Sequence, residues 1–548
     1  MGEIRLRGRP AAPGFARGPL VTLEARARRR LPNADPAQEA SALRAALAAA
    51  AAQLVSLRSH TNGTGADILG FQLALLEDDA LREPVLTRIA AGAAADEAWS
   101  AVLDAEIADY ASAADEHFQA RTADLKDLRD RVLACLSGDE DLPIAPGAVL
   151  AARDFPPSRF LSLDWSKGGA IILAGGSPTS HVAMLARARG VPMIVGLGIS
   201  ALALSGEALV DGRSGEAVIE ASPETQRLFE SRREVVTASD AEAAKLLDQP
   251  AVTRNGVRIA MHINIADPDE LDRVDRATCD GIGLVRTELL FHRSADLSDE
   301  EAQYAAYRRI IAWAQGRPVT IRTLDAGGDK PIAGLTLDGE SNPFLGVRGI
   351  RLSLLRPEIF RVQLRALARA AVHGCVKIML PMVTVPGELA AARALLEQEV
   401  AALQNAGIAA RRPPLGIMVE VPAAAIAVEA FDADFFSIGS NDLTQYVTAA
   451  GRDIAAVADL ADPLNPAVLR LIANVARHGR LSGREVSLCG DAGGDPALVP
   501  ALLGAGVRAL SVAPAALAAT KAAIAAIDVE EAGAAPLARL RSEADADG

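Results

Sequence analysis

The chain has 548 residues, of which 50% are apolar and 23% are charged. This length predicts three or four domains with a large buried core, and the composition argues against a disordered chain. The 56 basic and 70 acidic residues give a net charge of −14, which argues against nucleic acid or an anionic membrane as a partner. A local arginine cluster could still bind a small anion.

The N-terminus and the cysteines bear on the compartment. Met1-Gly2-Glu3-Ile4-Arg5 lacks the apolar core of a signal peptide, and no uncharged apolar run of about 20 residues indicates a membrane span. The four cysteines are far apart, which argues against a disulfide scaffold and against a Cys-x-x-Cys metal site. The sequence therefore predicts a soluble, multidomain, cytoplasmic protein without membrane insertion.

The sequence pattern of the N-terminal third changes near residue 34, from short apolar pieces to helical spacing. Residues 1–33 hold short apolar pieces and the turn Ala12-Pro13-Gly14. Residues 34–140 are almost free of proline and carry apolar residues three and four apart, for example in Phe71–Ala80 and Leu125–Leu136, which we expect to be helical. This pattern predicts an inserted bundle of several helices.

Residues 141–222 alternate between short apolar runs and turns. Pro143, Pro146 and the pair Pro156-Pro157 punctuate this region, and Ala170–Ala174 is typical of its strands. We expect an α/β domain here. A charged helical segment over residues 223–250 then serves as a linker.

Residues 251–548 contain eight β-rich runs, most of them separated by helical segments. Such an alternation predicts a (β/α)₈ TIM barrel, with a doubly wound open sheet as the alternative. The predicted strands are Arg258–Asn264, Gly281–Val285, Pro318–Thr323, Val376–Leu380, Leu415–Val419, Asp434–Ile438, Glu485–Leu488 and Val507–Val512.

Polar residues gather where these strands end, which in a barrel is the face that carries the chemistry. Arginines suit phosphate and carboxylate, because their donors form a fixed fork. Carboxylates such as Glu420 and Asp442 suit Mg²⁺ that bridges a phosphate. The predicted ligand is a small organic phosphate that carries a carboxylate. The arginines are Arg286, Arg322, Arg348 and Arg452.

Cys489 is the cysteine at a predicted strand end, and two interpretations of it remain open. A neutral thiol at this place could donate a proton to a carbanion or enolate. A buried cysteine can equally be an inert part of the core.

His181 follows the segment Gly175-Gly176-Ser177-Pro178-Thr179-Ser180 and precedes the helical pattern Val182–Arg189. Thr179 or Ser180 can cap this helix, so His181 would lie at its N-terminus. The helix dipole there disfavours imidazolium and favours an attached phosphoryl group. A phosphohistidine carrier is one interpretation, and a histidine in a cap or core hydrogen bond is the other.

Several longer motifs resemble one known family, the phosphoenolpyruvate-utilising enzymes. Thr179-Ser180-His181 with Ala186-Arg187 and Val191-Pro192 is similar to their phosphohistidine signature. Further similar segments are Gly283–Glu288, Arg322–Lys330, Asn342–Arg348 and Gly439–Tyr446.

The domain order resembles one branch of that family, Enzyme I of the bacterial sugar phosphotransferase system. The resemblance implies a swivelling phosphohistidine domain formed by residues 1–33 and 141–222. The helical insert, 34–140, would dock the phosphocarrier protein HPr. Residues 251–548 would bind phosphoenolpyruvate and form a homodimer.

The resemblance also implies roles for individual residues. His181 would accept the phosphoryl group on Nε2, and Cys489 would protonate the enolate to give pyruvate. Glu420 and Asp442 would bind Mg²⁺. The expected substrate-binding residues are Arg286, Arg322, Lys330, Arg348, Asn441, Asp442 and Arg452.

Some positions depart from the family pattern. Ser177-Pro178 adds one residue to the loop before His181, Arg452 follows Gly451, and Asp491 stands where glutamate is usual. Ser511–Pro514 also differs from the usual end of the last strand. These changes could shift affinity or partner choice but remove no residue that the chemistry requires.

Three alternatives share this scaffold. Pyruvate phosphate dikinase or phosphoenolpyruvate synthase would need a large ATP-binding domain, for which the chain has no room. A paralogue that serves a nitrogen-related or another dedicated carrier remains open. A catalytically silent regulatory scaffold is disfavoured, because the reactive residues are retained.

Overall fold

The computed structural model describes residues 2–23, 35–59, 61, 64–112, 116–138, 144–178, 180–291, 294–328, 330, 332, 334–337, 339–451 and 455–532. The chain forms two compact units, Met1–Val236 and Thr237–Gly548. Each unit is described by itself. Helix α8 (Pro223–Ala244) contains the boundary between them.

An eight-stranded mixed sheet organises the first unit, with the order β1-β8-β7-β3-β4-β5-β6-β2. Strands β3 to β6 pair in parallel, and the others pair antiparallel. The strands are β1 (Ile4–Arg7), β2 (Arg9–Ala12), β3 (Phe15–Thr22), β4 (Val149–Ala152), β5 (Ala170–Leu173), β6 (Met193–Val195), β7 (Gly206–Asp211) and β8 (Glu216–Ile219). Segments on both sides of the helical insert therefore build one sheet. The connections between its strands include α6 (Pro157–Ser162) and α7 (His181–Arg189).

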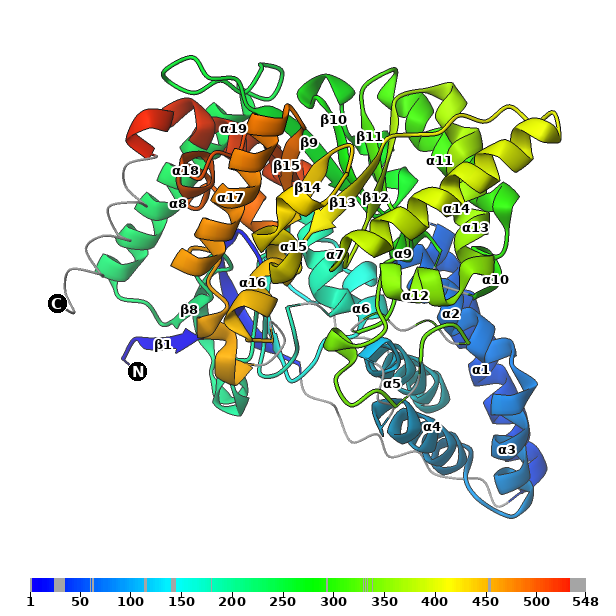
Figure 1. The fold of residues 1–548 in the computed structure, drawn as a ribbon. Coiled ribbons are helices and arrows are strands. Elements are labelled where there is room, and N and C mark those ends of the chain that lie inside the picture. Colours follow the sequence, from blue (N-terminus) through cyan, green and yellow to red (C-terminus); the bar gives the residue numbers. More distant parts are fainter. Residues whose placement is uncertain are drawn as a thin grey trace. The chain divides into compact units, whose positions relative to one another are not determined.

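The predicted helical bundle is confirmed between β3 and β4. It comprises α1 (Pro36–Ser59), α2 (Thr64–Glu77), α3 (Asp79–Ala90), α4 (Ala95–Ser112) and α5 (Glu116–Ser137), drawn mainly in blue in Figure 1. The helical spacing over Phe71–Ala80 is divided between two helices, α2 and α3. The break lies at Asp78, whose carboxylate accepts a hydrogen bond from the N–H of Ala80 and so caps α3.

Helix α1 is long and apolar enough to cross a membrane, by its length and its mean hydropathy of 1.4, and it is the one such helix in the described part of the chain. Its Leu43, Leu47 and Leu54 are buried within the first unit. The helix also packs against α2 and α5. One face of α1 is therefore buried against the bundle, while only 28% of its apolar window is buried in all.

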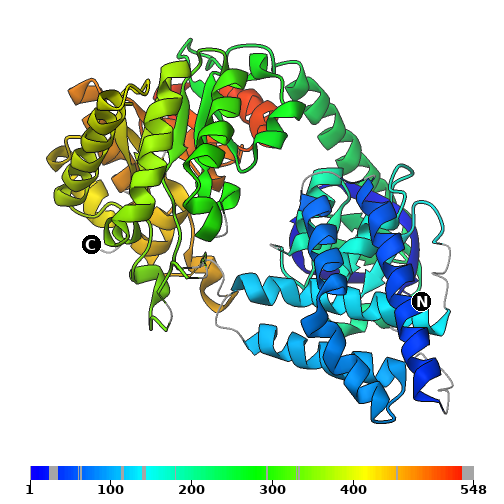
Figure 2. The ribbon, with the colours of Figure 1, turned by 90° about the vertical axis from the view of Figure 1, so that its right-hand side faces the viewer.

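The second unit is a closed barrel of eight parallel strands, which confirms the predicted TIM barrel and rejects the open sheet. The strands are β9 (Ala260–Ile265), β10 (Gly281–Arg286), β11 (Val319–Arg322), β12 (Val376–Leu380), β13 (Leu415–Val419), β14 (Phe436–Gly439), β15 (Val486–Cys489) and β16 (Ala509–Val512). Figure 2 shows the helices of this unit covering the outside of the sheet. The α-helices of this unit in the described residues are α9 (Thr287–Leu290), α10 (Ser294–Leu297), α11 (Glu300–Ala314), α12 (Ile350–Leu355), α13 (Pro357–Ala370), α14 (Pro386–Asn405), α15 (Pro422–Ile426), α16 (Ser440–Thr448), α17 (Pro466–Ser482), α18 (Val499–Gly504) and α19 (Leu517–Ala526).

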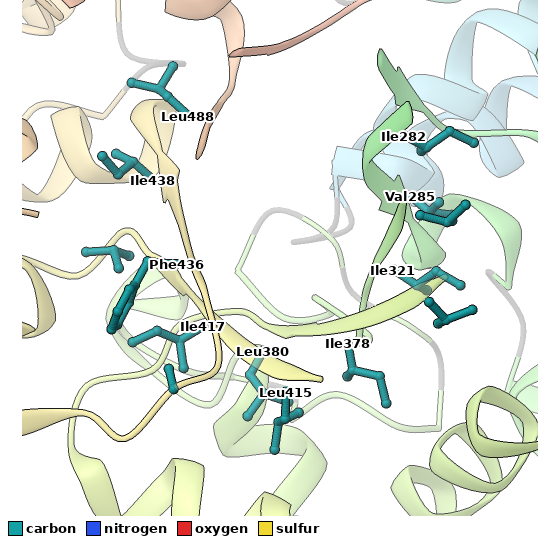
Figure 3. Packing of buried hydrophobic residues seen from close by; sticks show 14 of the residues in the cluster. Ile282, Val285, Ile321, Ile378, Leu380, Leu415, Ile417, Phe436, Ile438 and Leu488 are labelled. Atoms are coloured by element: carbon teal, nitrogen blue, oxygen red, sulfur yellow. The ribbon is translucent and has the colours of Figure 1, made fainter. Parts of the chain in front are cut away.

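Alternation along the strands decides which side chains enter the barrel. Residues such as Ile321, Ile378 and Phe436 belong to one large apolar cluster with the covering helices, as Figure 3 shows for several strands. The intervening residues face the interior, so Arg322 and Cys489, each the last residue of its strand, lie at the C-terminal mouth. The pattern thus buries an apolar outer layer and directs polar groups to the mouth.

Candidate active site

His181 is the first residue of α7, as predicted, and Ser180 is its N-cap. The hydroxyl of Ser180 accepts a hydrogen bond from the N–H of Ala183 at 3.4 Å. Thr179, the other predicted cap, lies outside the described residues. The imidazole therefore lies beside the positive end of a helix, where anions are favoured.

The ring of His181 is held by a carboxylate from the helical bundle. Its Nδ1 lies 3.3 Å from Oδ1 of Asp124, a residue of α5 whose side chain is fully buried, whereas the side chain of His181 is 14% exposed. A carboxylate can only accept here, so the proton belongs on Nδ1 and the lone pair on Nε2. Sequence analysis missed Asp124.

Two neighbours fix α5, and with it Asp124. The Nε2 of Gln72 donates to the backbone oxygen of Asp124 and to the carboxylate of Asp127, each at 3.1 Å. Asp127 also accepts from the N–H and the hydroxyl of Ser158, at 2.9 and 2.6 Å. Burial raises the pKa of Asp127. These contacts tie the bundle to α6 and hold Asp124 opposite His181.

Two arginines hold the loop that carries the extra residue. Arg9 donates to the backbone oxygen of Gly176 at 3.0 Å. Arg187 donates to the backbone oxygens of Pro178 and Ala11, at 2.8 and 2.5 Å. The longer loop is therefore pinned by charged donors on both sides, and His181 stays at the helix N-terminus.

Strand register brings predicted site residues together at the barrel mouth. Arg286 and Arg322 are register partners on β10 and β11. Cys489 on β15 pairs with Gly439 on β14. Arg286 is half-buried and Arg322 is 5% exposed. Arg286 and Arg322 are therefore attached at neighbouring backbone positions at one edge of the mouth.

Arg322 is held by two carboxylates that the site prediction did not include. Its Nη2 contacts Oε1 of Glu288, and its Nη1 lies 3.2 Å from Oδ2 of Asp325. Lys330 joins the same two carboxylates, at 3.0 and 3.3 Å. The Oε2 of Glu288 is buried without a hydrogen-bond partner. Both carboxylates stand within the family-like segments, which was the available signal.

Arg348 is 0% exposed and lies between two aspartates. It makes two hydrogen bonds to Asp325, each 3.0 Å, and two to Asp442, at 3.1 and 3.0 Å. Burial alone would raise the pKa of Asp325, but the charges of Arg322 and Arg348 outweigh it and hold that pKa well below its usual range.

Glycine permits the close approach of the loop to Arg348. Gly327 has a φ of +101°, and a Cβ on it would lie 2.5 Å from the backbone oxygen of Val347. The bend after β11 therefore needs glycine for both its conformation and its packing.

Glu420 follows β13 and is 1% exposed. Its Oε1 accepts from the N–H of Met382 at 2.6 Å, and a Cβ on Gly439 would lie 2.8 Å from its Oε2. Burial and the negative charge of Asp442 raise the pKa of Glu420 to about 8. Negative charge at this place is therefore only partly offset by the protein.

The raised pKa of Glu420 beside Asp442 bears on whether a cation fits at these two carboxylates. Within the described ranges, no cluster of three or more histidine, cysteine or acidic side chains is arranged to hold a metal ion by itself. Glu420 and Asp442 nevertheless offer hard oxygen ligands, and a divalent cation would offset the repulsion between them. The pair fits a metal whose remaining ligands come from a substrate or water.

Cys489 is 1% exposed and lies among apolar side chains, including Met379 and Met418. The hydroxyl of Ser437 donates to its Sγ, and the thiol donates to the backbone oxygen of Ile438, each at 3.5 Å. Burial raises the pKa of the thiol. The group is therefore a neutral thiol at the barrel mouth, able to donate a proton.

The neighbouring Asn441 is fixed by the unusual Asp491. The amide of Asn441 donates to the Asp491 carboxylate, and its oxygen accepts from the Asp491 N–H, each at 3.0 Å. Aspartate at this position thus retains a two-point contact. Arg452 lies outside the described residues.

Three family models match the chain, all described as domains of PEP-utilising enzymes. They cover residues 7–121 (N-terminal), 144–215 (mobile domain) and 240–529 (PEP-binding domain). The chain belongs to the family of PEP-utilising enzymes. The predicted family resemblance is thereby confirmed for both units.

Curated relatives support the same assignment along most of the length. A phosphoenolpyruvate-protein phosphotransferase of Geobacillus stearothermophilus is 38% identical over 494 residues, which is 87% of this chain and 85% of that protein. The protein of the same name from Bacillus subtilis is 36% identical, covering 87% and 86%. That from Staphylococcus carnosus is 37% identical over the same shares. This PEP-utilising enzyme is therefore a transferase by homology.

Proposed function

We propose that the chain transfers the phosphoryl group of phosphoenolpyruvate to Nε2 of His181 and then to a histidine of HPr, with release of pyruvate. The observation that carries this proposal is the contact between Asp124 and Nδ1, which leaves Nε2 as the nucleophile. The names of the relatives, protein phosphotransferases, support a protein acceptor.

The charged cluster at the barrel mouth is the proposed phosphoenolpyruvate site. Arg286, Arg322 and Lys330 supply the positive charge that phosphoryl transfer needs, with Arg452, Asn441 and Asp442 as the remaining predicted contacts. Glu288 and Asp325 keep Arg322 in place, so little reorganisation is required when substrate binds. The buried position of Arg348 supports a role in holding the Asp442 carboxylate in place.

Mg²⁺ is the proposed cofactor. Glu420 and Asp442 would hold it, and the cation would supply positive charge to the phosphate and to the enolate oxygen. A cation at this place would favour the ionised form of Glu420, whose pKa is raised by burial and by the charge of Asp442. Both oxygens of Asp442 accept hydrogen bonds from Arg348, which fixes the orientation of this carboxylate.

Cys489 is the proposed proton donor. When the phosphorus–oxygen bond breaks, the enolate of pyruvate accepts the thiol proton at its methylene carbon and becomes the ketone. The sulfur is left as a thiolate, which the hydroxyl of Ser437 stabilises by its hydrogen bond. Ketone formation draws the transfer forward.

His181 would serve two partners in turn, phosphoenolpyruvate bound by the arginines and HPr bound by the helical bundle, so the reaction would require the histidine-bearing domain to move. The proline-rich segment 141–157 and the linker 223–250 are the proposed hinges. HPr would dock on the helical bundle, two chains would associate through the barrel unit, and the protein would act in the cytoplasm.

Radiolabelled phosphoenolpyruvate tests this proposal. The wild-type protein should acquire one acid-labile label, His181→Ala should acquire none, and HPr should remove the label from the wild type. ATP should label neither protein. Acid-labile label retained by His181→Ala would contradict the proposal.

A further inference from the structure

Behind strands β10 and β11, four buried polar side chains form a continuous hydrogen-bonded group. Gln303 and Tyr307 come from α11, Gln363 from α13 and Thr287 from the start of α9. Each is at most 3% exposed. None of them is a predicted substrate contact, and buried polar groups are costly unless they are hydrogen-bonded, so the group calls for an explanation.

Gln363 is the centre of this group. Its Oε1 accepts from the backbone N–H of Leu324 at 3.1 Å. Its Nε2 donates to the hydroxyls of Thr287 and Tyr307, at 3.3 and 3.2 Å. The Thr287 hydroxyl in turn donates to the backbone oxygen of Arg322 at 2.9 Å. Gln363 thus holds the backbone on both sides of Thr323.

The place of these two contacts matters, because β11 ends at Arg322. Thr323 still donates its N–H to the neighbouring strand, at the oxygen of Met379, but Leu324 lies beyond the sheet and donates to a side chain instead. The next residue is Asp325, which contacts both Arg322 and Arg348. The segment that Gln363 holds by hydrogen bonds therefore includes two charged residues of the barrel mouth, Arg322 and Asp325.

We propose that Gln363 is a positioning residue for phosphoenolpyruvate: by fixing the backbone at Arg322 and Leu324, it sets where the Arg322 and Asp325 side chains stand. The inference rests on the proposed function, in which Arg322 binds the substrate phosphate. A small displacement of a phosphate-binding arginine weakens binding, because the forked donors must meet the ligand oxygens in a fixed geometry.

Gln303 provides a matched control. It is also a fully buried glutamine, its Nε2 donates to the backbone oxygen of Leu297 at 2.9 Å, and its Oε1 accepts from Tyr307 at 3.2 Å. These two hydrogen bonds do not reach the segment from Arg322 to Asp325. Replacing either glutamine with methionine removes a buried amide from the same group, so a purely structural role predicts similar consequences.

The experiment measures the dissociation constant of phosphoenolpyruvate by calorimetry with Mg²⁺, in a His181→Ala parent that cannot turn over. Gln363→Met should raise the constant by about tenfold or more, whereas Gln303→Met should change it less than about twofold. Gln363→Glu keeps an oxygen for the Leu324 N–H and should recover most of the affinity. In chains with His181 intact, KM should follow the same order.

Equal shifts in the two methionine variants, or an unchanged constant in Gln363→Met, would overturn the inference. If Gln363→Met does not fold, Gln363→Asn answers the question, because it stays polar but is too short to reach Leu324. It should weaken binding by about threefold or more, and wild-type affinity would overturn the inference. Absence of binding in the His181→Ala parent would instead overturn the proposed function, and this inference with it.

Discussion

His181 and Arg348 occupy opposite kinds of environment. His181 is partly exposed, begins a helix, and its ring is steadied by one carboxylate, Asp124. Arg348 is 0% exposed and makes four hydrogen bonds to two aspartates within a network that includes Arg322 and Lys330. A side chain that must carry a phosphoryl group between two partners needs an accessible nitrogen with a lone pair. A group that shapes a binding site needs to stay where it is.

The difference follows from the cost of burying charge. An arginine without water must be compensated by carboxylates of good geometry, and such a network tolerates little movement. A neutral imidazole has no such requirement, because one hydrogen bond settles which nitrogen holds the proton. Three substitutions should distinguish the neutral, accessible histidine from the buried network of charged side chains.

Cys489→Ala should have the largest effect on the chemistry of the barrel. Loss of the proton donor should slow pyruvate formation by about 10²- to 10⁴-fold. Because burial raises the thiol pKa, the wild-type rate should not fall with rising pH until the solution is well alkaline. Rapid-quench assays of pyruvate measure both effects. Cys375→Ala, at an exposed cysteine, is the control, and an unchanged rate in Cys489→Ala would remove the thiol from the mechanism.

Arg348→Met should damage the rigid network next most strongly. Its removal leaves Asp442 beside Glu420 without the guanidinium, which should lower the free energy of unfolding of the barrel by about 3–5 kcal/mol. Urea unfolding measures the change. Arg351→Met is the matched control, because Arg351 donates to the backbone oxygens of Leu345 and Gly346. A loss no larger than in this control would show that the network is not stabilising.

Asp124→Ala should give the smallest change of the three. Phosphoryl transfer to His181 should slow by about 10- to 100-fold, because the ring loses the acceptor that keeps its proton on Nδ1. Affinity for phosphoenolpyruvate should stay the same, since the arginine cluster is untouched. Single-turnover labelling measures the rate, with Asp130→Ala on the same helix as the control. Equal rates in the two variants would exclude an orienting role for Asp124.

The barrel could be predicted from the sequence because each strand and helix has a pattern that is visible within a few consecutive residues. The run Pro318–Thr323 predicts a strand, and β11 is Val319–Arg322, so Arg322 falls at the mouth where the pattern places it. The same holds for Cys489 at the end of β15. Strand alternation and chain order are enough to place these two residues at the mouth, but they did not indicate Glu288 and Asp325 as the partners of Arg322.

Contacts made by distant helices could not be predicted in this way. Asp124 and His181 are 57 residues apart, and nothing local to α5 indicates that Asp124 faces the histidine. Gln363 has no motif of its own, and its contact with the Leu324 N–H depends on how α13 packs on the barrel. The apolar spacing of this region does not reveal the break at Asp78, because the spacing continues across it; the local signal is the aspartate itself, which caps α3.

The central claim concerns one nitrogen atom, and NMR of the phosphorylated protein tests it most directly. Protein with ¹⁵N-labelled histidine, incubated with phosphoenolpyruvate and Mg²⁺, should show coupling between phosphorus and Nε2 of His181, with the proton retained on Nδ1. Coupling to Nδ1, or to a nitrogen of another histidine, would contradict the account.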